Sequence, residues 1–353
     1  KGLIMVTNSL RSNAPGSSLP LLVFSHLRWD FVFQRPQHLM TRYAKTRRVY
    51  FIEEPIFEDA IAPHMKTSER AGGVLIAVPA LPHGMSYEEI NAELKNLVNG
   101  LIRDEKIGRF ATWYYTPMAL SFTDHLKPEV VMYDCMDELS AFRGAPPSLV
   151  QNELRLMEMA DVVYTGGHSL YEAKKNQHHN IHPFPSSIDR AHFGQARSAL
   201  KEPSDQSIIP GKRIGFFGVI DERFDIELLR EMAILRPDWN FVIIGPVVKI
   251  DANDLPRSAN IFYLGQKDYQ QLPQYLAGWD IAMLPFAKNE STQFISPTKT
   301  PEYLAAGRPV ISTSIRDVVK PYGDQNLVGI ADSAPEFIAI AQSYFDRDST
   351  ATG

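Results

Sequence analysis

Short apolar runs alternate with amphipathic helical patterns along this chain, and the alternation restricts the fold more than any other feature. Strands that alternate with helices require right-handed crossovers and parallel sheets covered on both faces. The predicted strands are residues 21–26, 48–55, 73–79, 111–117, 130–135, 161–166, 213–220, 238–245, 260–265, 280–286 and 309–314. The clearest predicted helices are residues 86–105, 148–160 and 225–236. The pattern predicts an α/β protein with doubly wound parallel sheets.

A polar stretch without apolar periodicity, residues 194–212, interrupts the alternation and reads as an interdomain linker. The chain of 353 residues exceeds one ordinary core and fits two domains of common size. We therefore predict two Rossmann-like domains, an N-terminal one over residues 1–198 and a C-terminal one over residues 199–353.

Composition excludes several classes of protein. Hydrophobic content of 44% with 22% charged residues is typical of a water-soluble globular chain, and the net charge of -5 argues against a nucleic-acid binder. Cys135 is the only cysteine, so a disulfide framework or a cysteine zinc cluster is excluded. Apolar runs stay well below the roughly 20 residues that span a bilayer. The polar opening, residues 6–20, does not read as a signal peptide, which predicts a cytoplasmic protein.

The loop after the first strand, "SHLRWDFVFQRPQH", holds an unusual set of polar and aromatic side chains. In doubly wound sheets, ligands bind beyond the carboxyl ends of the strands. Trp29 and Arg35 are therefore candidate substrate contacts, Asp30 is a candidate base and His38 a second catalytic candidate. The alternative is a solvated connection in which Trp29 packs on the core and His38 lies on a helix surface.

Two further loops of the N-terminal half carry candidates. In "YDCMDELSAF", Asp134 and Asp137 lie close enough for one carboxylate to raise the pKa of the other and produce a general base, with Asp137 the candidate. They would otherwise cap a turn and a helix. In "TGGHSLYEA", His168 is a candidate substrate contact or a hydrogen-bonded interdomain histidine, and Ser169 is a predicted helix cap.

The C-terminal half opens with "GFFGVIDERFD", in which Gly218 follows a strand and Arg223 comes shortly after. The first turns of the two halves lack G-x-G-x-x-G, and the chain lacks the P-loop motif, so dinucleotide and P-loop nucleotide sites are disfavoured. A glycine turn with an arginine still suits a diphosphate, because guanidinium forms paired hydrogen bonds with phosphate oxygens.

The segment "SPTKTPEYLAAGRPV", residues 296–310, places a lysine at the predicted start of a helix. We predict Ser296 as N-cap, Lys299 in the first turn and Gly307 as the left-handed stop. A bound anion would explain a cation beside amides that carry partial positive charge. The Glu302 carboxylate could accept hydrogen bonds from both hydroxyls of a ribose. If the bound anion is a phosphate, a neighbouring ribose makes the ligand a nucleotide, so the segment predicts a nucleotide site. The alternative is an exposed i,i+3 ion pair.

The chain resembles the GT-B glycosyltransferases, and most closely the GT4-like bacterial enzymes of cell-surface polysaccharide assembly. The resemblance covers nearly the whole chain and is carried by "HLRWDFVFQRPQHL", "ADVVYTGGHSLYEAK", "PSSIDRAHF" and "SPTKTPEYLAAGRPVI". It implies two Rossmann-like domains that face a central cleft. It also implies a nucleotide-sugar donor, probable UDP linkage of that donor, a glycan or lipid-linked acceptor, and neither a cofactor nor a metal.

Site residues carried over by the resemblance lie in the C-terminal half. Glu302 matches the glutamate that holds the donor ribose, Lys299 a residue near the diphosphate, Gly218 the phosphate-loop glycine and Arg223 a basic phosphate ligand. The family pattern E-x7-E is not kept, because Phe294 stands in the first position and Glu290 lies further upstream. Glu290 is thus a candidate donor-sugar contact. An inverting reaction would require a carboxylate base, for which Asp30 or Asp137 is available.

Two other functions fit the same sequence. One is a nucleotide-sugar epimerase on the same architecture, since fold does not determine reaction. The other is a non-catalytic module that binds a sugar nucleotide or a glycan. The basic stretch "RYAKTRR", residues 42–48, could touch anionic lipid on the inner face of the cell membrane, or could be an ordinary solvated helix end.

Overall fold

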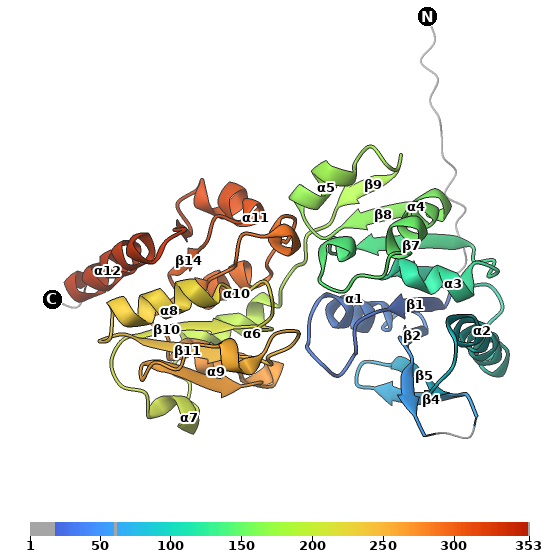
Figure 1. Ribbon diagram of the computed structural model, residues 1–353, viewed down its shortest axis with the longest axis horizontal. Coiled ribbons are helices and arrows are strands. Elements are labelled where there is room, and N and C mark those ends of the chain that lie inside the picture. The colour runs from blue at the N-terminus through green and yellow to red at the C-terminus, as the bar shows by residue number, and fades with distance from the viewer. Residues whose placement is uncertain (1–17, 60–61, 352–353) are drawn as a thin grey trace, which may run out of the picture. The chain divides into compact units, whose positions relative to one another are not determined.

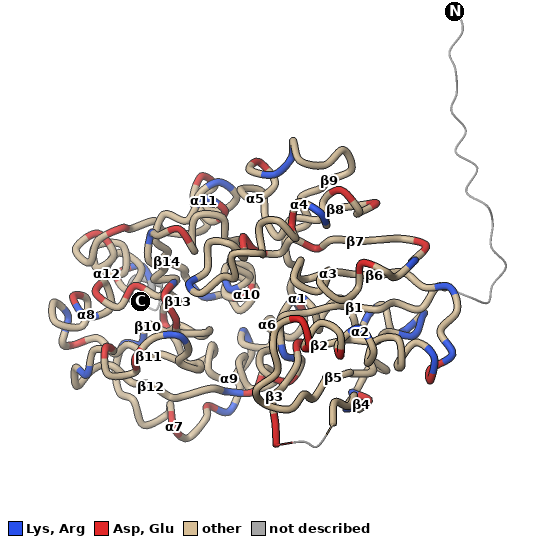
Figure 2. Tube along the Cα trace, turned by 45° about the vertical axis from the view of Figure 1, so that its right-hand side comes forward, with Lys and Arg blue, Asp and Glu red and all other residues tan. Residues whose placement is uncertain are grey.

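The computed structural model describes residues 18–59 and 62–351 (Figure 1). Most of the polar opening segment lies outside these residues. The chain divides into two compact units, residues 1–132 and 133–353. The domain boundary after residue 198 stays a prediction. Basic and acidic positions are interspersed along the trace of both units (Figure 2).

The strands of unit 1 lie in the order β3-β5-β2-β1-β6, and β4 pairs with β5. The printed pairs are parallel except β4 with β5, which is antiparallel over seven residue pairs. The strands are β1 Leu21–Ser25, β2 Val49–Glu53, β3 Ile56–Glu58, β4 His64–Arg70, β5 Val74–Pro82 and β6 Ala111–Tyr114. The helices are α1 Arg35–Tyr43, α2 Tyr87–Asp104 and α3 Leu120–Thr123.

Unit 2 begins within β7 Val130–Cys135, and strands β8 and β9 follow in parallel. Its separate six-stranded sheet has the order β12-β11-β10-β13-β14-β15, and its strand pairs are parallel. These strands are β8 Val162–Thr165, β9 Ile181–Pro183, β10 Arg213–Phe217, β11 Asn240–Ile244, β12 Ile261–Gly265, β13 Ile281–Leu284, β14 Val310–Ser312 and β15 Gly329–Ile330. The predicted α/β class with two parallel sheets is confirmed.

Helices cover both faces of the six-stranded sheet. One face packs on α8 and α12 through Leu229, Met232 and Phe337, and the other packs on α6, α9 and α10 through Phe193, Leu276 and Tyr303. Figure 1 shows α8 lying along this sheet. The helices of unit 2 are α4 Leu149–Met159, α5 His168–Lys174, α6 Arg190–Gly194, α7 Ser204–Ser207, α8 Ile226–Leu235, α9 Leu272–Ala277, α10 Lys299–Ala305, α11 Arg316–Val318 and α12 Ala334–Ala351.

Local signals explain the predicted helices. At the start of α2, Ser86 and Glu89 form a capping box, in which each side chain accepts the backbone N–H of the other. At the start of α8, the Asp225 side chain accepts the N–H of Leu228. The predicted helices 86–105, 148–160 and 225–236 are confirmed as α2, α4 and α8.

The prediction missed β4, and its composition explains why. The strand reads HMKTSER and is mostly exposed, so it lacks the apolar alternation by which a half-buried strand is recognised. It forms because the backbone of β5 offers a full antiparallel register from His64 opposite Ala80 to Arg70 opposite Val74. The short strands β3, β9 and β15 were missed as well.

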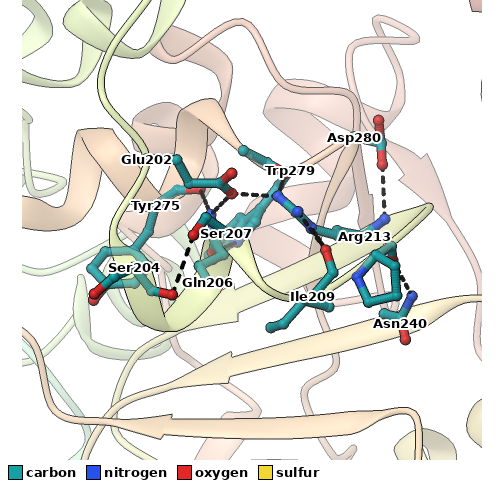
Figure 3. Close-up of polar contacts among 12 residues, drawn as sticks. Glu202, Ser204, Gln206, Ser207, Ile209, Arg213, Asn240, Tyr275, Trp279 and Asp280 are labelled. Carbon is teal, nitrogen blue, oxygen red and sulfur yellow. Dashed lines mark hydrogen bonds and ion pairs between the residues drawn. The ribbon is translucent and has the colours of Figure 1, made fainter.

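Residues 194–212, which the sequence predicts as a linker, pack against the six-stranded sheet within unit 2. Ile209 and Gln206 are buried there. The Gln206 amide donates to the Tyr275 carbonyl at 3.0 Å and accepts the indole N–H of Trp279 at 2.8 Å. Figure 3 shows these side chains converging with the Glu202–Arg213 ion pair. The polar residues of this stretch therefore form a buried network.

Replacing Gln206 with Ala should destabilise the protein by about 1–3 kcal/mol, because the buried Trp279 N–H loses its acceptor. Urea unfolding measures the change. Ser207→Ala is the matched control, since Ser207 is exposed and its hydroxyl bonds only the nearby Ser204 carbonyl. Equal stability of the two variants would contradict the role given to Gln206.

Candidate functional site

Gly218 forms a tight crossing with Lys299 at the carboxyl end of β10. Gly218 has φ +154°, and its N–H donates to the Ile244 carbonyl at 2.9 Å. A Cβ here would lie 2.2 Å from Cε of Lys299 and 3.0 Å from its Nζ. Only glycine therefore lets the lysine side chain lie across this strand end. Gly245 supports the turn, because its own Cβ would lie 1.8 Å from the Gly218 carbonyl oxygen.

Arg223 is held beside this turn by a carboxylate that the sequence analysis did not identify. Asp221 is buried and accepts two hydrogen bonds from the guanidinium, at 3.0 Å from Nε and 2.7 Å from Nη2. The Arg223 guanidinium also lies 5.5 Å from the ring centre of Phe142. The spacing D-x-R could have suggested this pair, since a bidentate partner fixes the direction in which an arginine points.

The loop after β13 is tied to the loop after β10. Ala287 N–H donates to the Arg223 carbonyl at 2.8 Å, and the Asn289 side chain donates to the Glu222 carbonyl at 2.9 Å. Glu290 opens the short 3-10 helix Glu290–Thr292 on this second loop and is exposed. Glu290 thus stands next to the site while its contact with a donor sugar stays a prediction.

The helix that carries Lys299 and Glu302 begins later than predicted. It starts at Lys299, its N-cap position is Thr298, and the cap has no side-chain hydrogen bond. The prediction of Ser296 as N-cap is wrong, because Ser296 and Pro297 stay in irregular backbone before the helix. The left-handed stop at Gly307 is confirmed by its φ of +74°.

Helix α10 is fixed to the end of β10 by a buried tyrosine. The Tyr303 hydroxyl accepts the N–H of Phe217 at 3.0 Å, and the Tyr303 ring meets the Phe217 ring edge-on at 4.9 Å. Tyr303 is completely buried. Lys299 and Glu302 therefore lie on a helix that Tyr303 holds against the end of β10.

Glu302 and Lys299 are both poorly hydrated. Glu302 is only 8% exposed, and burial raises its pKa to about 7 although the Lys299 charge opposes the rise. Burial likewise lowers the pKa of Lys299, the Glu302 charge opposes this, and the Arg223 charge adds to it. The alternative of an exposed i,i+3 pair is wrong. A ligand with an anion for the cations and hydroxyls for Glu302 would satisfy both groups.

Asp137 is the N-terminal-half carboxylate that the structure brings to this corner. Its charge acts on both Arg223 and Lys299. Asp134 is completely buried in β7. Of the two carboxylates in this loop, Asp137 is therefore the one placed beside the cations.

His168 and Ser296 line a second part of unit 2, a cavity of about 700 Å³ that also includes Arg316 and Lys320. His168 is the first residue of α5, and the prediction that Ser169 caps this helix is wrong. The N-cap is Gly167, and the Ser169 N–H donates to Oδ1 of Asp317 at 2.9 Å. The helix is thus capped by a side chain 148 residues further along the chain.

The remaining candidates lie in unit 1. Trp29 is 8% exposed, packs edge-on against Phe51 at 5.0 Å and donates its backbone N–H to Glu53 at 2.7 Å. Arg35 is buried in the first turn of α1. His38 lies on the same helix and meets the ring of Phe33 at 4.8 Å.

Asp30 is exposed and forms an ion pair with Arg70 at 2.7 Å. The hydrogen bond from Arg70 lowers the pKa of the Asp30 carboxyl. A carboxylate stabilised in this way is a weaker proton acceptor than a free one.

Among the described residues, no group of three His, Cys, Asp or Glu side chains is arranged to hold a metal ion. Within the same ranges, every helix is too short or too polar to cross a membrane.

Comparison with known proteins relates this chain to glycosyltransferases. Residues 211–345 match the family model described as "Glycosyl transferases group 1". A protein of Bacillus subtilis (strain 168), provisionally named as the teichuronic acid biosynthesis glycosyltransferase TuaH, is 26% identical over 266 residues. The match covers 69% of this chain and 66% of that protein, just under two thirds of its length.

Solved structures with the same fold cover nearly the whole chain. Sucrose-phosphate synthase from Thermosynechococcus elongatus has a TM-score of 0.67 at 13% identity and covers 93% of this chain and 90% of its own. HepE from Anabaena, in complex with UDP and glucose, has a TM-score of 0.66 at 12% identity and covers 94% and 91%.

The pH dependence of stability should report the burial of Glu302. Its folded pKa of about 7 lies above the unfolded value of 4.5, so the native state binds more protons between these pH values. Stability should therefore fall by up to about 3 kcal/mol as pH rises through this window. Urea unfolding of the wild type and of Glu302→Gln at pH 5 and pH 8 isolates the effect. The same fall in both proteins would show that Glu302 is not its source.

Gly218, Arg223, Lys299 and Glu302 all fall within the matched segment. Residues 211–345 are therefore similar to the group 1 glycosyl transferases, and the chain shares the two-sheet fold of the GT-B glycosyltransferases.

Proposed function

We propose that this glycosyltransferase moves a sugar from a UDP-linked donor to a glycan acceptor during cell-surface polysaccharide synthesis. One observation carries the proposal: Lys299 and Glu302 stand poorly hydrated on one short helix, directly over the Gly218 turn. The names of two similar proteins support its details. TuaH is named for teichuronic acid biosynthesis, and the HepE structure is titled as a complex with UDP and glucose.

In this proposal the diphosphate binds at the Gly218 turn, against Lys299 and Arg223, and the ribose hydroxyls donate to Glu302. The bond between the sugar's anomeric carbon and the diphosphate oxygen breaks, and the acceptor hydroxyl oxygen bonds to that carbon. Lys299 and Arg223 stabilise the negative charge that develops on the departing UDP. The two cationic side chains supply this charge stabilisation, and the proposal requires neither a metal nor a cofactor.

We further propose Asp137 as the carboxylate that receives the proton of the acceptor hydroxyl if the reaction inverts the anomeric centre. Its charge acts on the same two cations that would hold the leaving group. Asp30 is disfavoured for this role because Arg70 already stabilises its ionised form.

The acceptor in this proposal is a glycan, either free or linked to lipid. A lipid-linked acceptor would bring the enzyme to the inner face of the cell membrane. The basic residues 42–48, at the end of α1, are the candidate contact with anionic lipid.

Replacing Glu302 with Ala should weaken UDP binding at least about a hundredfold, because the ribose hydroxyls lose a charged acceptor in a dry site. Isothermal titration calorimetry measures the affinity. Glu227→Ala is the matched control, since Glu227 is an exposed glutamate of α8 in the same domain. Unchanged affinity in Glu302→Ala would refute the donor site.

Replacing Asp137 with Asn should lower the rate of sugar transfer about a hundredfold and leave UDP affinity within about threefold, because a general base contributes to the chemical step. Asp30→Asn should transfer at nearly the wild-type rate. Release of UDP in the presence of acceptor measures both. A greater loss in Asp30→Asn would reverse the assignment.

A further inference from the structure

A buried ion-pair network lies behind the loop that carries Asp137. Nζ of Lys174, the last residue of α5, lies 2.8 Å from Oε2 of Glu138 and 2.8 Å from Oε2 of Glu153 in α4. The Lys174 side chain is only 5% exposed. Each charge in such a network depends on its partner, because removal of one partner leaves an uncompensated charge in the interior.

Residues of β7 and of the loop after it complete the network. The Tyr133 hydroxyl donates to Oε1 of Glu153 at 2.7 Å, and the Cys135 sulfur lies 3.6 Å from the same oxygen. Oε1 of Glu138 accepts the Ser140 hydroxyl at 2.6 Å. Burial raises the pKa of the Cys135 thiol and the Glu153 charge adds to the rise, so the thiol stays protonated and unreactive. Both carboxylates are thus paired within the protein and the thiol is inert, so the network acts on the protein's own loop.

The network and the end of β8 hold the backbone on both sides of Asp137. After Asp137, Glu138 is fixed by its ion pair. Before Asp137, the Cys135 carbonyl accepts the N–H of Gly166 at 2.9 Å, and a Cβ on Gly166 would collide with the Met136 carbonyl oxygen. The Cys135 sulfur also lies 3.7 Å from the carbonyl oxygen of Asp137 itself. The backbone from which the Asp137 side chain projects is therefore held in one conformation.

Helix α5 joins this turn to the segment that leads into α10. Its last residue is Lys174, and its N-cap is Gly167. A Cβ on Gly167 would lie 2.6 Å from Cβ of Ser296, which stands three residues before Lys299. The helix has seven residues and spans only about 10 Å. One short element thus connects the turn of Asp137 with the approach to Lys299.

We propose that Lys174 is a positioning residue for Asp137, because its ion pair with Glu138 keeps the Asp137 carboxylate beside the cations of the proposed donor site. The charge of Asp137 acts on both of these cations, Arg223 and Lys299. Loss of the ion pair would release Glu138, and the turn would open more often. The positioning itself does not rest on the proposed function. Only its effect on sugar transfer does.

Hydrogen–deuterium exchange of the full chain tests the positioning without any substrate. Amides of residues 135–142 should exchange about tenfold faster in Lys174→Met and in Glu138→Gln, because the turn opens more often once the ion pair is lost. Amides of α8 should exchange as in the wild type, which separates a local change from loss of the fold. Glu138→Gln keeps Lys174 paired with Glu153, so it guards against a variant that does not fold.

Lys175→Met is the matched control. Lys175 is the next residue along the chain, and its ion pair with Glu172 is exposed. Exchange of residues 135–142 should therefore be the same in this variant as in the wild type. Equal acceleration in Lys175→Met and Lys174→Met, or wild-type exchange of this segment in Glu138→Gln, would overturn the proposal.

A double-mutant cycle tests whether the ion pair acts through Asp137. The assay is release of UDP from UDP-glucose, UDP-galactose and UDP-N-acetylglucosamine, with water as the acceptor. For a donor that the wild type turns over, kcat should fall about tenfold in Glu138→Gln with KM within about threefold, because misplacing a reacting group slows the chemical step. In an Asp137→Asn background, Glu138→Gln should cause no further fall, since the group that it positions is gone. A further tenfold fall would show that Glu138 acts through another residue and overturn the proposal.

The two experiments separate this proposal from the proposed function. A wild-type rate of UDP release in Asp137→Asn, or no release from any of the three donors, would count against the proposed function. Faster exchange in Glu138→Gln would still show that the ion pair holds the turn. Unchanged exchange together with slow UDP release by Asp137→Asn would refute the positioning and leave the proposed function standing.

Discussion

The crossing of the Lys299 side chain over Gly218 is the contact on which the proposed donor site depends. It brings an ammonium group to a strand end where a side chain of any size would collide with it. Burial then penalises the charges of both Lys299 and Glu302. The proposed donor would offset this cost, because its phosphate and hydroxyl groups would replace the missing hydration of both side chains.

Three contacts hold the residues of this site in place. Tyr303 fixes α10 to β10, Asp221 fixes Arg223, and the Ala287 N–H joins the two loops. On the same sheet face that α10 covers, Gln206 hydrogen-bonds Tyr275 and Trp279, although the sequence pattern around Gln206 is polar. The Gln206 side chain thus stabilises the fold, because its hydrogen bonds are satisfied within the protein. Lys299 and Glu302 differ from it, because burial penalises their charges.

The sequence allowed the parts of this protein with local signals to be predicted. The alternation of strands and helices yielded the fold class. Gly218 was identified by its place after a predicted strand and Gly307 as a left-handed helix stop, and both have positive φ in the structure. Pairings between distant residues could not be predicted. Arg70 reaches Asp30 across 40 residues, and Asp317 reaches Ser169 across 148. The start of α10 was misplaced because Ser296 and Pro297 match the sequence preferences of a helix start, whereas the helix begins at Lys299.

The cap of α5 has a consequence for the order in which the chain folds during synthesis. Gly167 offers no side chain to the first turn, and a Cβ added to it would lie 2.2 Å from Oδ2 of Asp317 and 2.6 Å from Cβ of Ser296. The amino end of the helix is therefore capped by a residue far along the chain. During synthesis on the ribosome, the first turn of α5 therefore lacks this hydrogen-bond acceptor until Asp317, 148 residues later in the chain, has emerged.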